Sequence, residues 1–154
     1  RFTLAPSIRI RRSSQSRWRK EQGMSVQYYE GIGRRKESSA RVRIMAGSGK
    51  FVVNEKPIEA YFTRMGDQQT ILAALEAAGE NPAQLDITVV VNGGGVTGQT
   101  DAVKLGLARA LLLMNPDLRS SLRAGGFLTR DPRVKERKKP GLKRARKAPT
   151  YTKR

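Results

Sequence analysis

Hydrophobic and polar residues alternate over residues 39–45 of the chain. Arg41 and Arg43 share one side of this segment, and three apolar residues share the other: Ala40, Val42 and Ile44. A period of two is the pattern of a strand with one buried face, so this strand is predicted to present arginine outward. Residues 47–49, Gly-Ser-Gly, favour a turn, and residues 50–53 are then predicted to return as the second strand of a hairpin.

A helical period begins at Asp67, which is predicted to be the N-cap residue of a helix that ends at Gly79. Its apolar stripe holds Ile71, Leu75 and Ala78. Residues 85–91 form a strongly apolar run between turn residues. A run of this length and composition predicts a buried strand in the centre of a sheet.

A longer helix is predicted after residue 96, with Thr97 or Thr100 as its N-cap and Pro116 as its stop. Its apolar stripe holds Val103, Leu107, Leu111 and Met114. Lys104 and Arg109 lie off this stripe and are candidates for outward-facing cations.

One more short helix is predicted to start with Asn115 as N-cap and Pro116 at its first position, and to end at the pair Gly125-Gly126. The alternation of strand and helix patterns predicts a mixed α/β body. After Leu128 the apolar period ends, and four residues that break helices follow: Pro132, Pro140, Gly141 and Pro149. An extended tail is therefore predicted for residues 129–154.

Charge is distributed unevenly along the chain. The chain has 154 residues and a formal net charge of +18, but residues 25–128 hold 12 Lys+Arg against 10 Asp+Glu. Residues 129–154 hold 12 against 2, and residues 1–24 hold 7 against 1. Because runs of like charge repel themselves and cannot form a packed core, we expect a globular body, residues 25–128, between two basic arms. The partner of such arms is a polyanion, above all a nucleic acid.

Composition also excludes several kinds of chemistry. The chain contains neither cysteine nor histidine, so it lacks disulfides, thiolate metal ligands and the commonest general base. The 13 acidic residues are scattered, without the spacing of a calcium loop or of paired catalytic carboxylates. No apolar run approaches the length of about 20 residues that a membrane helix needs. We expect no metal, no cofactor, no small-molecule substrate, no membrane and no catalytic residue.

One enzyme-like motif needs separate treatment. Residues 93–98, Gly-Gly-Gly-Val-Thr-Gly, satisfy GxGxxG between a predicted strand and a predicted helix, as in a dinucleotide-binding turn. That turn also requires a second parallel strand after the helix, and none is predicted here. The alternatives are a turn that brings backbone amides close to an RNA phosphate, or a tight bend without a ligand, and we favour the bend.

Residues 33–36, Gly-Arg-Arg-Lys, lead directly into the strand that carries Arg41 and Arg43. We expect five cations to gather on one exposed sheet face and its adjoining loop. The competing interpretation is a basic face that is merely solvated. Arginine favours the first reading, because its planar guanidinium binds phosphate through two hydrogen bonds at once.

Residues 1–24 are rich in Arg and Ser and poor in acids, which is typical of an organelle transit peptide. Met24 is a candidate for the start of an ancestral chain without this extension. A basic tail can also serve as a nuclear address, so a nuclear protein that binds nucleic acid remains an alternative, and an enzyme that uses residues 93–98 is a more remote one.

Four segments together resemble one known family: GIGRRKESSARVRI, VNGGGVTGQTDAVKLGLARALL, FLTRDPRVKERKKPGLKRARKAP and the terminal TKR. They closely resemble the universal ninth small-subunit ribosomal protein in its bacterial and organellar form. The resemblance implies an α/β (α+β) two-layer sandwich like the second domain of the fifth small-subunit ribosomal protein, with extended basic arms. It also implies a structural role in the head of the small subunit, beside neighbouring head proteins.

The same resemblance implies that residues 33–36 and the tail bind ribosomal RNA, and that Lys153 and Arg154 contact the P-site tRNA. Pro140 stands where the family often has Tyr, which removes a stacking residue. With the transit-like residues 1–24, the resemblance favours a chloroplast ribosome over a mitochondrial or bacterial cytoplasmic one. The candidate rRNA-binding residues are Arg34, Arg35, Lys36, Arg41, Arg43, Lys104, Arg109, Arg130, Arg133, Lys135, Arg137, Lys138, Lys139, Lys143, Arg144, Arg146 and Lys147.

Overall fold

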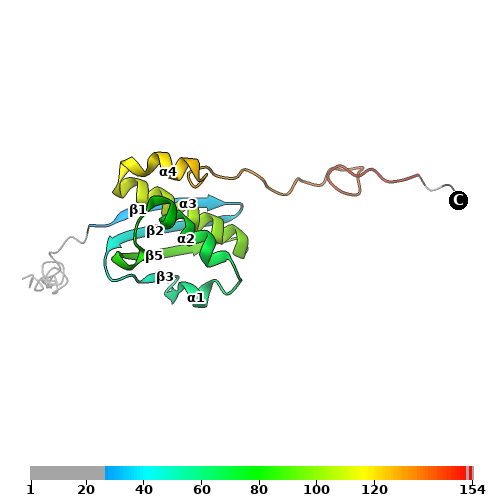
Figure 1. Cartoon of the computed structure of the whole chain (residues 1–154). Helices are drawn as coiled ribbons and strands as arrows, with labels where there is room; N and C mark the ends of the chain where they lie inside the picture. The colour runs from blue at the N-terminus through cyan, green and yellow to red at the C-terminus, as the bar shows by residue number, and fades with distance from the viewer. Residues whose placement is uncertain (1–26, 152, 154) are drawn as a thin grey trace, which may run out of the picture.

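A five-stranded sheet forms one layer of the molecule and the longer helices cover one of its faces, in the computed structural model shown in Figure 1. The structure describes residues 27–151 and 153. The strands are β1 (Tyr29–Arg35), β2 (Ser38–Ala46), β3 (Phe51–Val53), β4 (Lys56–Pro57) and β5 (Leu85–Asn92). The helices are α1 (Ile58–Tyr61), α2 (Asp67–Ala78), α3 (Val96–Met114) and α4 (Arg119–Ala124), with 3-10 turns η1 (Pro82–Gln84) and η2 (Pro116–Leu118). The predicted two-layer α/β class is confirmed.

β5 lies in the middle of the sheet, whose order is β1-β2-β5-β3-β4. It pairs antiparallel with β2 and parallel with β3. Ile87, Val89 and Val91 point into the core and are almost completely buried. The central strand predicted from the apolar run is therefore confirmed.

The predicted hairpin is wrong. β3 does not pair with β2, because β5 lies between them. The glycine-containing loop crosses the end of β5, where the Asp86 carboxylate accepts hydrogen bonds from the backbone amides of Ser48 (2.8 Å) and Lys50 (3.0 Å). A turn sequence predicts a change of direction, but the long-range partner of the next strand depends on a segment more than thirty residues later in the chain.

β1 was not predicted as a strand, because its glycines and cations resemble a loop. Its side chains alternate, with Gly31 and Gly33 facing α3 and buried. A Cβ atom on Gly33 would collide with the carbonyl oxygen of Ala102, and one on Gly31 with that of Gly106. The two glycines thus let the backbones of β1 and α3 approach closely, which a larger residue would prevent.

Helix α3 buries Val103, Leu107 and Leu111 as its stripe predicts, but neither predicted threonine caps it. The residue before the helix is Gly95, and the Thr100 hydroxyl lies one turn inside, where it donates to the carbonyl oxygen of Val96 at 2.9 Å. The N-cap of α2 is Gly66, one residue before the predicted cap Asp67. Asp67 is the first residue of the helix and pairs with Arg64. The predicted Asn115 cap is confirmed, since its side-chain oxygen accepts from the amide of Asp117, although the element it caps is the 3-10 turn η2.

The tail leaves the body after α4 and runs far beyond it (Figure 1). It has no strand or helix from Thr129 onward among the described residues. It is not extended throughout, however. Around residues 139–147 it closes a compact loop, in which the Lys143 amide donates to the Lys147 carbonyl oxygen at 2.7 Å and Gly141 has a φ of 79°.

Candidate nucleic-acid interface

The sheet face opposite the helices is open to solvent and carries arginine. Arg34 on β1 and Arg41 on β2 are exposed on this face, and neither forms an ion pair with an acid among the described residues. Two apolar side chains of the same face, Ile32 on β1 and Val90 on β5, lie on either side of Arg41 and are 48% and 43% exposed. They line a shallow groove together with Arg34 and Arg41. The face therefore combines unpaired cations with exposed apolar side chains.

Arg43 lies on the same face but is already partnered. Its Nε donates to Glu30 Oε2 at 2.7 Å, and its guanidinium carbon lies 5.0 Å from the centre of the Tyr28 ring. The hydrogen bond with Glu30 raises the pKa of Arg43 above its ordinary value, so the guanidinium stays charged. Its charge is nevertheless partly compensated, unlike that of Arg41.

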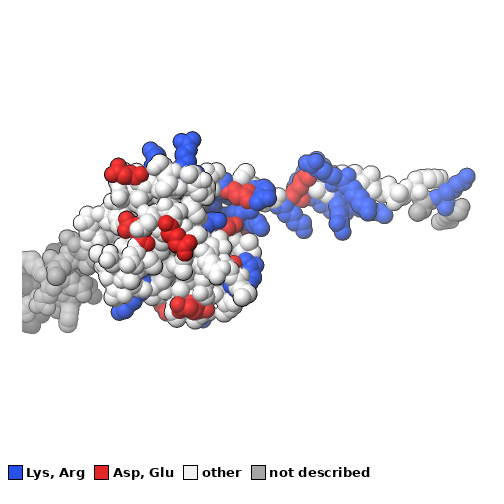
Figure 2. Space-filling model, in the orientation of Figure 1, with Lys and Arg blue, Asp and Glu red and all other residues white. Residues whose placement is uncertain are grey.

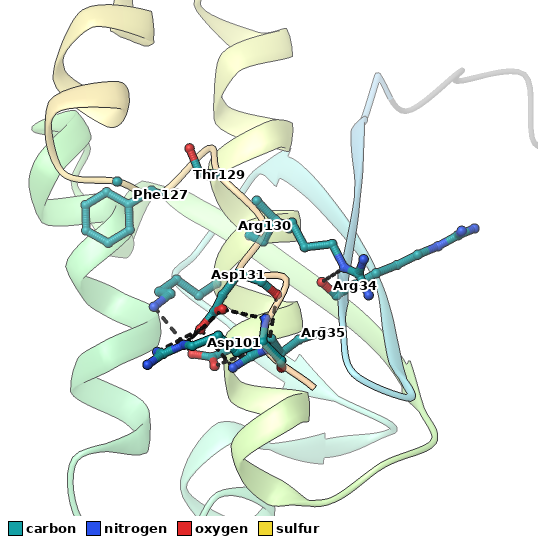
Figure 3. Close-up of a pocket in the computed structure, with 11 residues that line it drawn as sticks. Arg34, Arg35, Asp101, Phe127, Thr129, Arg130 and Asp131 are labelled. Atoms are coloured by element: carbon teal, nitrogen blue, oxygen red, sulfur yellow. Dashed lines mark hydrogen bonds and ion pairs between the residues drawn. The ribbon is translucent and has the colours of Figure 1, made fainter. Parts of the chain in front are cut away.

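Arg35 contradicts the prediction of five cations on one face. It is only 8% exposed and lies on the helix side of β1, since side chains in a strand alternate between faces. It pairs with Asp101 of α3 and with Asp131 of the tail (Figure 3). Arg35 is therefore a structural cation and not part of an exposed RNA-binding patch. Lys36 is exposed at the turn between β1 and β2, with a φ of 51°.

The two candidate cations of α3, Lys104 and Arg109, differ in exposure. Lys104 is partly buried, and its Nζ lies 3.4 Å from Asp101 Oδ1, beside the Arg35 cluster. Arg109 is exposed, and its Nη1 donates to the carbonyl oxygen of Ile32 at 2.7 Å. The structure thus places both at the β1–α3 contact, and neither joins Arg41 on the open face.

The tail carries half of the described cations that form no ion pair, although it is much shorter than the body. Figure 2 shows Lys and Arg side chains crowded along it, whereas acidic and basic groups are mixed on the body. Only Asp131 and Glu136 are acidic within it. Asp131 pairs with Arg35 and Arg133, and Glu136 with Arg146 (2.9 Å) and Lys139 (3.8 Å). The remaining described tail cations form no ion pair with the described residues: Arg130, Lys135, Arg137, Lys138, Lys143, Arg144, Lys147 and Lys153.

The pairing of the two tail acids has an electrostatic consequence. The Asp131 pKa is lowered to about 2, first by the hydrogen bond from the Arg133 side chain. Because both acids are held by cations of this chain, they offer little repulsion to a bound polyanion.

Arg154 and residues 1–24 lie outside the described residues.

Residues 93–98 do not form a dinucleotide site. A Cβ atom on Gly94 would collide with the Ser38 hydroxyl, and Gly98 approaches the same side chain. The Ser38 hydroxyl donates to the carbonyl oxygen of Gly93 at 3.0 Å. The glycines are thus used to pack the bend between β5 and α3 against β2. A dinucleotide-binding motif would require a parallel strand after helix α3. Only η2 and α4 follow it, and residues 115–151 contain no strand.

Two kinds of feature are absent from the described residues. Over residues 27–151 and 153, no cluster of three or more acidic side chains is arranged to hold a metal ion. Across the same residues, no helix has the length and apolar character needed to cross a membrane.

Reasoning from the sequence missed two features of this interface. The exposed apolar side chains of Ile32 and Val90 were not predicted, although the alternation of Gly31, Ile32 and Gly33 is itself a strand signal. The pairing of Arg35 with Asp101 and Asp131 was also missed, because these acids lie 66 and 96 positions away along the chain.

Comparison with known proteins identifies the family. The model of the family "Ribosomal protein S9/S16" matches residues 33–154. Small ribosomal subunit protein uS9 of Crocosphaera subtropica is 57% identical over 128 residues, which are 82% of this chain and 92% of the relative. The uS9 protein of Gloeothece citriformis matches equally well, and uS9c of Gracilaria tenuistipitata var. liui is 53% identical over 127 residues, with the same coverage of both chains. This chain therefore belongs to the ribosomal protein S9/S16 family.

Proposed function

We propose that the chain is a structural constituent of the small ribosomal subunit that binds rRNA of the subunit head. The observation that carries the proposal is the tail, which concentrates 12 of the 31 Lys and Arg residues in residues 129–154, outside the folded body. The relatives named above are small-subunit proteins, and their similarity extends over 92% of their length. Family membership and charge distribution thus support the same role.

The tail binds RNA by neutralising phosphates. If fully stretched, 26 residues reach roughly 85 Å at about 3.3 Å per residue, which exceeds the radius of the body several-fold. An arm of this length can thread between helices of a folded RNA and contact phosphates that a compact domain cannot reach. Each contact releases counterions, which supplies much of the affinity at low salt. We assign this role to the cations from Arg130 to Lys147.

The open sheet face provides a second contact. Arg34 and Arg41 supply uncompensated charge, and Lys36 extends the basic surface at the adjoining turn. Ile32 and Val90, on either side of Arg41, supply exposed apolar surface against which an unstacked base or a sugar can lie. We propose that RNA lies across this face, with phosphates at the arginines.

The end of the chain has a separate role in the proposal. Lys153 and Arg154 contact the P-site tRNA, as the family resemblance implies. Lys153 is exposed. The tail thus binds a permanent partner along most of its length and a transient one at its end.

We propose that the chain works in chloroplast ribosomes. The support is the relative uS9c of Gracilaria tenuistipitata var. liui and the Arg- and Ser-rich composition of residues 1–24. Cyanobacterial relatives of 57% identity are equally consistent with a bacterial-type ribosome. No residue is proposed as catalytic, and no cofactor is assigned.

Sedimentation of chloroplast ribosomes tests the proposal. Tagged full-length chain should sediment with the small subunit after removal of Mg²⁺ has separated the subunits. A chain without residues 129–154 should be lost from that fraction in high salt, because its phosphate contacts are gone. If the full-length chain remains in the ribosome-free supernatant, the proposed role is wrong.

A further inference from the structure

We infer that Arg35 is a positioning residue, which fixes the place where the basic tail leaves the body and the direction in which it starts. The inference rests on the proposed function, because it concerns how the tail is presented to RNA. Arg35 joins three segments, since it lies on β1, Asp101 lies on α3, and Asp131 and Arg133 lie in the tail. Figure 3 shows the Arg35, Asp101 and Asp131 side chains pointing toward one another, whereas Arg34 points away.

The guanidinium of Arg35 uses four hydrogen bonds. Nε donates to Asp101 Oδ2 at 3.3 Å, and Nη2 donates to Asp131 Oδ2 at 2.9 Å. Nη1 donates to the backbone carbonyl oxygens of Asp131 (3.1 Å) and Arg133 (2.7 Å). Two carbonyl acceptors two residues apart define the course of the main chain, which a contact with a side chain alone would not do.

Arginine is the residue that suits this position. Its planar fork presents donors in fixed directions, whereas a lysine ammonium offers three donors from one atom. The side chain of Arg35 is only 9% exposed, so loss of its partners would leave a nearly buried charge. The contact is therefore strongly favoured once the body has folded.

The contact also marks the end of the anchored part of the tail. Phe127 and Leu128 pack against the hydrophobic core, and Arg130 Nε donates to the carbonyl oxygen of Arg34 at 3.3 Å. After Arg133, no described residue of the tail forms a hydrogen bond or ion pair with the body. The part of the tail before Val134 is thus held in one path along β1. The part after it extends from a fixed position on the body.

A fixed origin benefits RNA binding by preorganisation. A tail that leaves the body in many directions must lose this freedom on binding, which lowers affinity without removing a single phosphate contact. The Arg35 contact removes part of that cost in advance.

Spin labels in the full-length chain test the inference directly. The natural chain has no cysteine, so Gln69→Cys on α2 and Val134→Cys just beyond the contact give two unique attachment sites. Pulsed electron paramagnetic resonance then measures the distribution of distances between the two spin labels. We expect a narrow distribution in the parent chain and one at least twice as wide in Arg35→Met. Arg34→Met, a neighbour with the same loss of charge on the opposite face, should retain the narrow distribution.

A second pair of measurements separates this inference from the proposed function. Arg35→Met should lower the affinity for rRNA about tenfold and leave the salt dependence of binding unchanged, whereas Arg34→Met should reduce the salt dependence. Asp131→Ala removes the acceptor of Nη2 and leaves the two backbone acceptors of Nη1, so it should widen the distribution less than Arg35→Met does. It changes the tail alone and tests the contact even if Arg35→Met fails to fold. If both variants with a disrupted contact keep the narrow distribution, the inference is overturned. If the parent chain binds no rRNA, the proposed function fails, while the label distances still decide the role of Arg35.

Discussion

Glu30 on β1 and Arg43 on β2 lie opposite each other in the sheet and form an ion pair, with 2.7 Å between Oε2 and Nε. Arg41, two residues earlier on the same strand face, lies opposite Ile32 and has no acidic partner among the described residues. The two arginines look equivalent in the sequence. The cross-strand partner makes the difference, since it compensates one charge and leaves the other available to phosphate.

Arg41→Ala is therefore expected to weaken RNA binding more than Arg43→Ala. Loss of a free cation that contacts one phosphate should reduce the log–log salt slope of binding by about 0.7 to 0.9. The Arg43 variant should change the slope by much less, because that charge already interacts with Glu30. Binding of a head-domain rRNA fragment, measured over a range of salt concentrations, gives both slopes. Equal slopes for the two variants would contradict the assignment.

The Asp86 carboxylate is expected to make stability depend on acid pH. The pKa of Asp86 is lowered, first by the hydrogen bond from the Lys50 amide and then by that from Ser48. A lowered folded-state pKa means that the contribution to stability is present above the unfolded pKa of about 3.9 and is lost as the pH falls through the folded value. Asp86→Asn should lower the Tm at pH 7, and this difference from the parent chain should shrink below about pH 4.

Thermal unfolding at pH 7 and at pH 3 measures this difference. Glu59→Gln is the matched control, because Glu59 is exposed and no hydrogen bond or ion pair with the described residues involves its side chain. A difference for Asp86→Asn that persists unchanged at pH 3 would show that the charge of the carboxylate does not hold the loop.

Gly33→Ala is expected to destabilise the body strongly. The new Cβ atom would meet the carbonyl oxygen of Ala102, which belongs to a helix backbone and cannot rotate away. Overpacking of this kind typically costs about 1–3 kcal/mol, and we expect the upper part of that range. Gly95→Ala is the control, because a Cβ there would meet no atom within 4 Å. Urea unfolding of both variants gives the comparison, and equal stabilities would refute the close packing of β1 on α3.

Much of the fold follows from local patterns. The period of the apolar residues correctly predicted a helix that buries Ile71 and Leu75, a central strand through Val89, and a long helix that buries Leu107 and Leu111. These signals are strong because each element faces the same core over several turns or residues. The predicted N-caps of two helices were wrong, since a glycine, and not the nearest polar residue, precedes both α2 and α3.

The features that the sequence did not predict depend on distant partners. β3 pairs with β5, a strand that follows two helices later in the chain, and no local sequence pattern predicts this pairing. The same is true of the site. The concentration of cations in the tail was evident from composition, but the burial of Arg35 and the compensation of Arg43 depend on acids placed nearby by the fold.

Lys153 and Arg154 are expected to act on tRNA and not on assembly. A chain that lacks only these two residues should enter small subunits normally, because it keeps the cations from Arg130 to Lys147, which we propose bind rRNA. It should hold P-site tRNA less tightly, which a filter-binding assay on reconstituted subunits measures as faster tRNA release. The double variant Lys143→Ala/Lys147→Ala removes the same charge from within the tail and serves as the control. Unchanged tRNA release in the truncated chain would refute the terminal contact.

The salt dependence of rRNA binding tests the central claim most directly, with the full-length chain compared with a chain that ends at Leu128. If the tail binds phosphates, the full-length chain should show a steep log–log slope, with about 0.7 to 0.9 for each phosphate contacted, and the shortened chain should lose most of that slope. A full-length chain whose affinity hardly changes with salt, or a shortened chain with the same slope, would contradict the account.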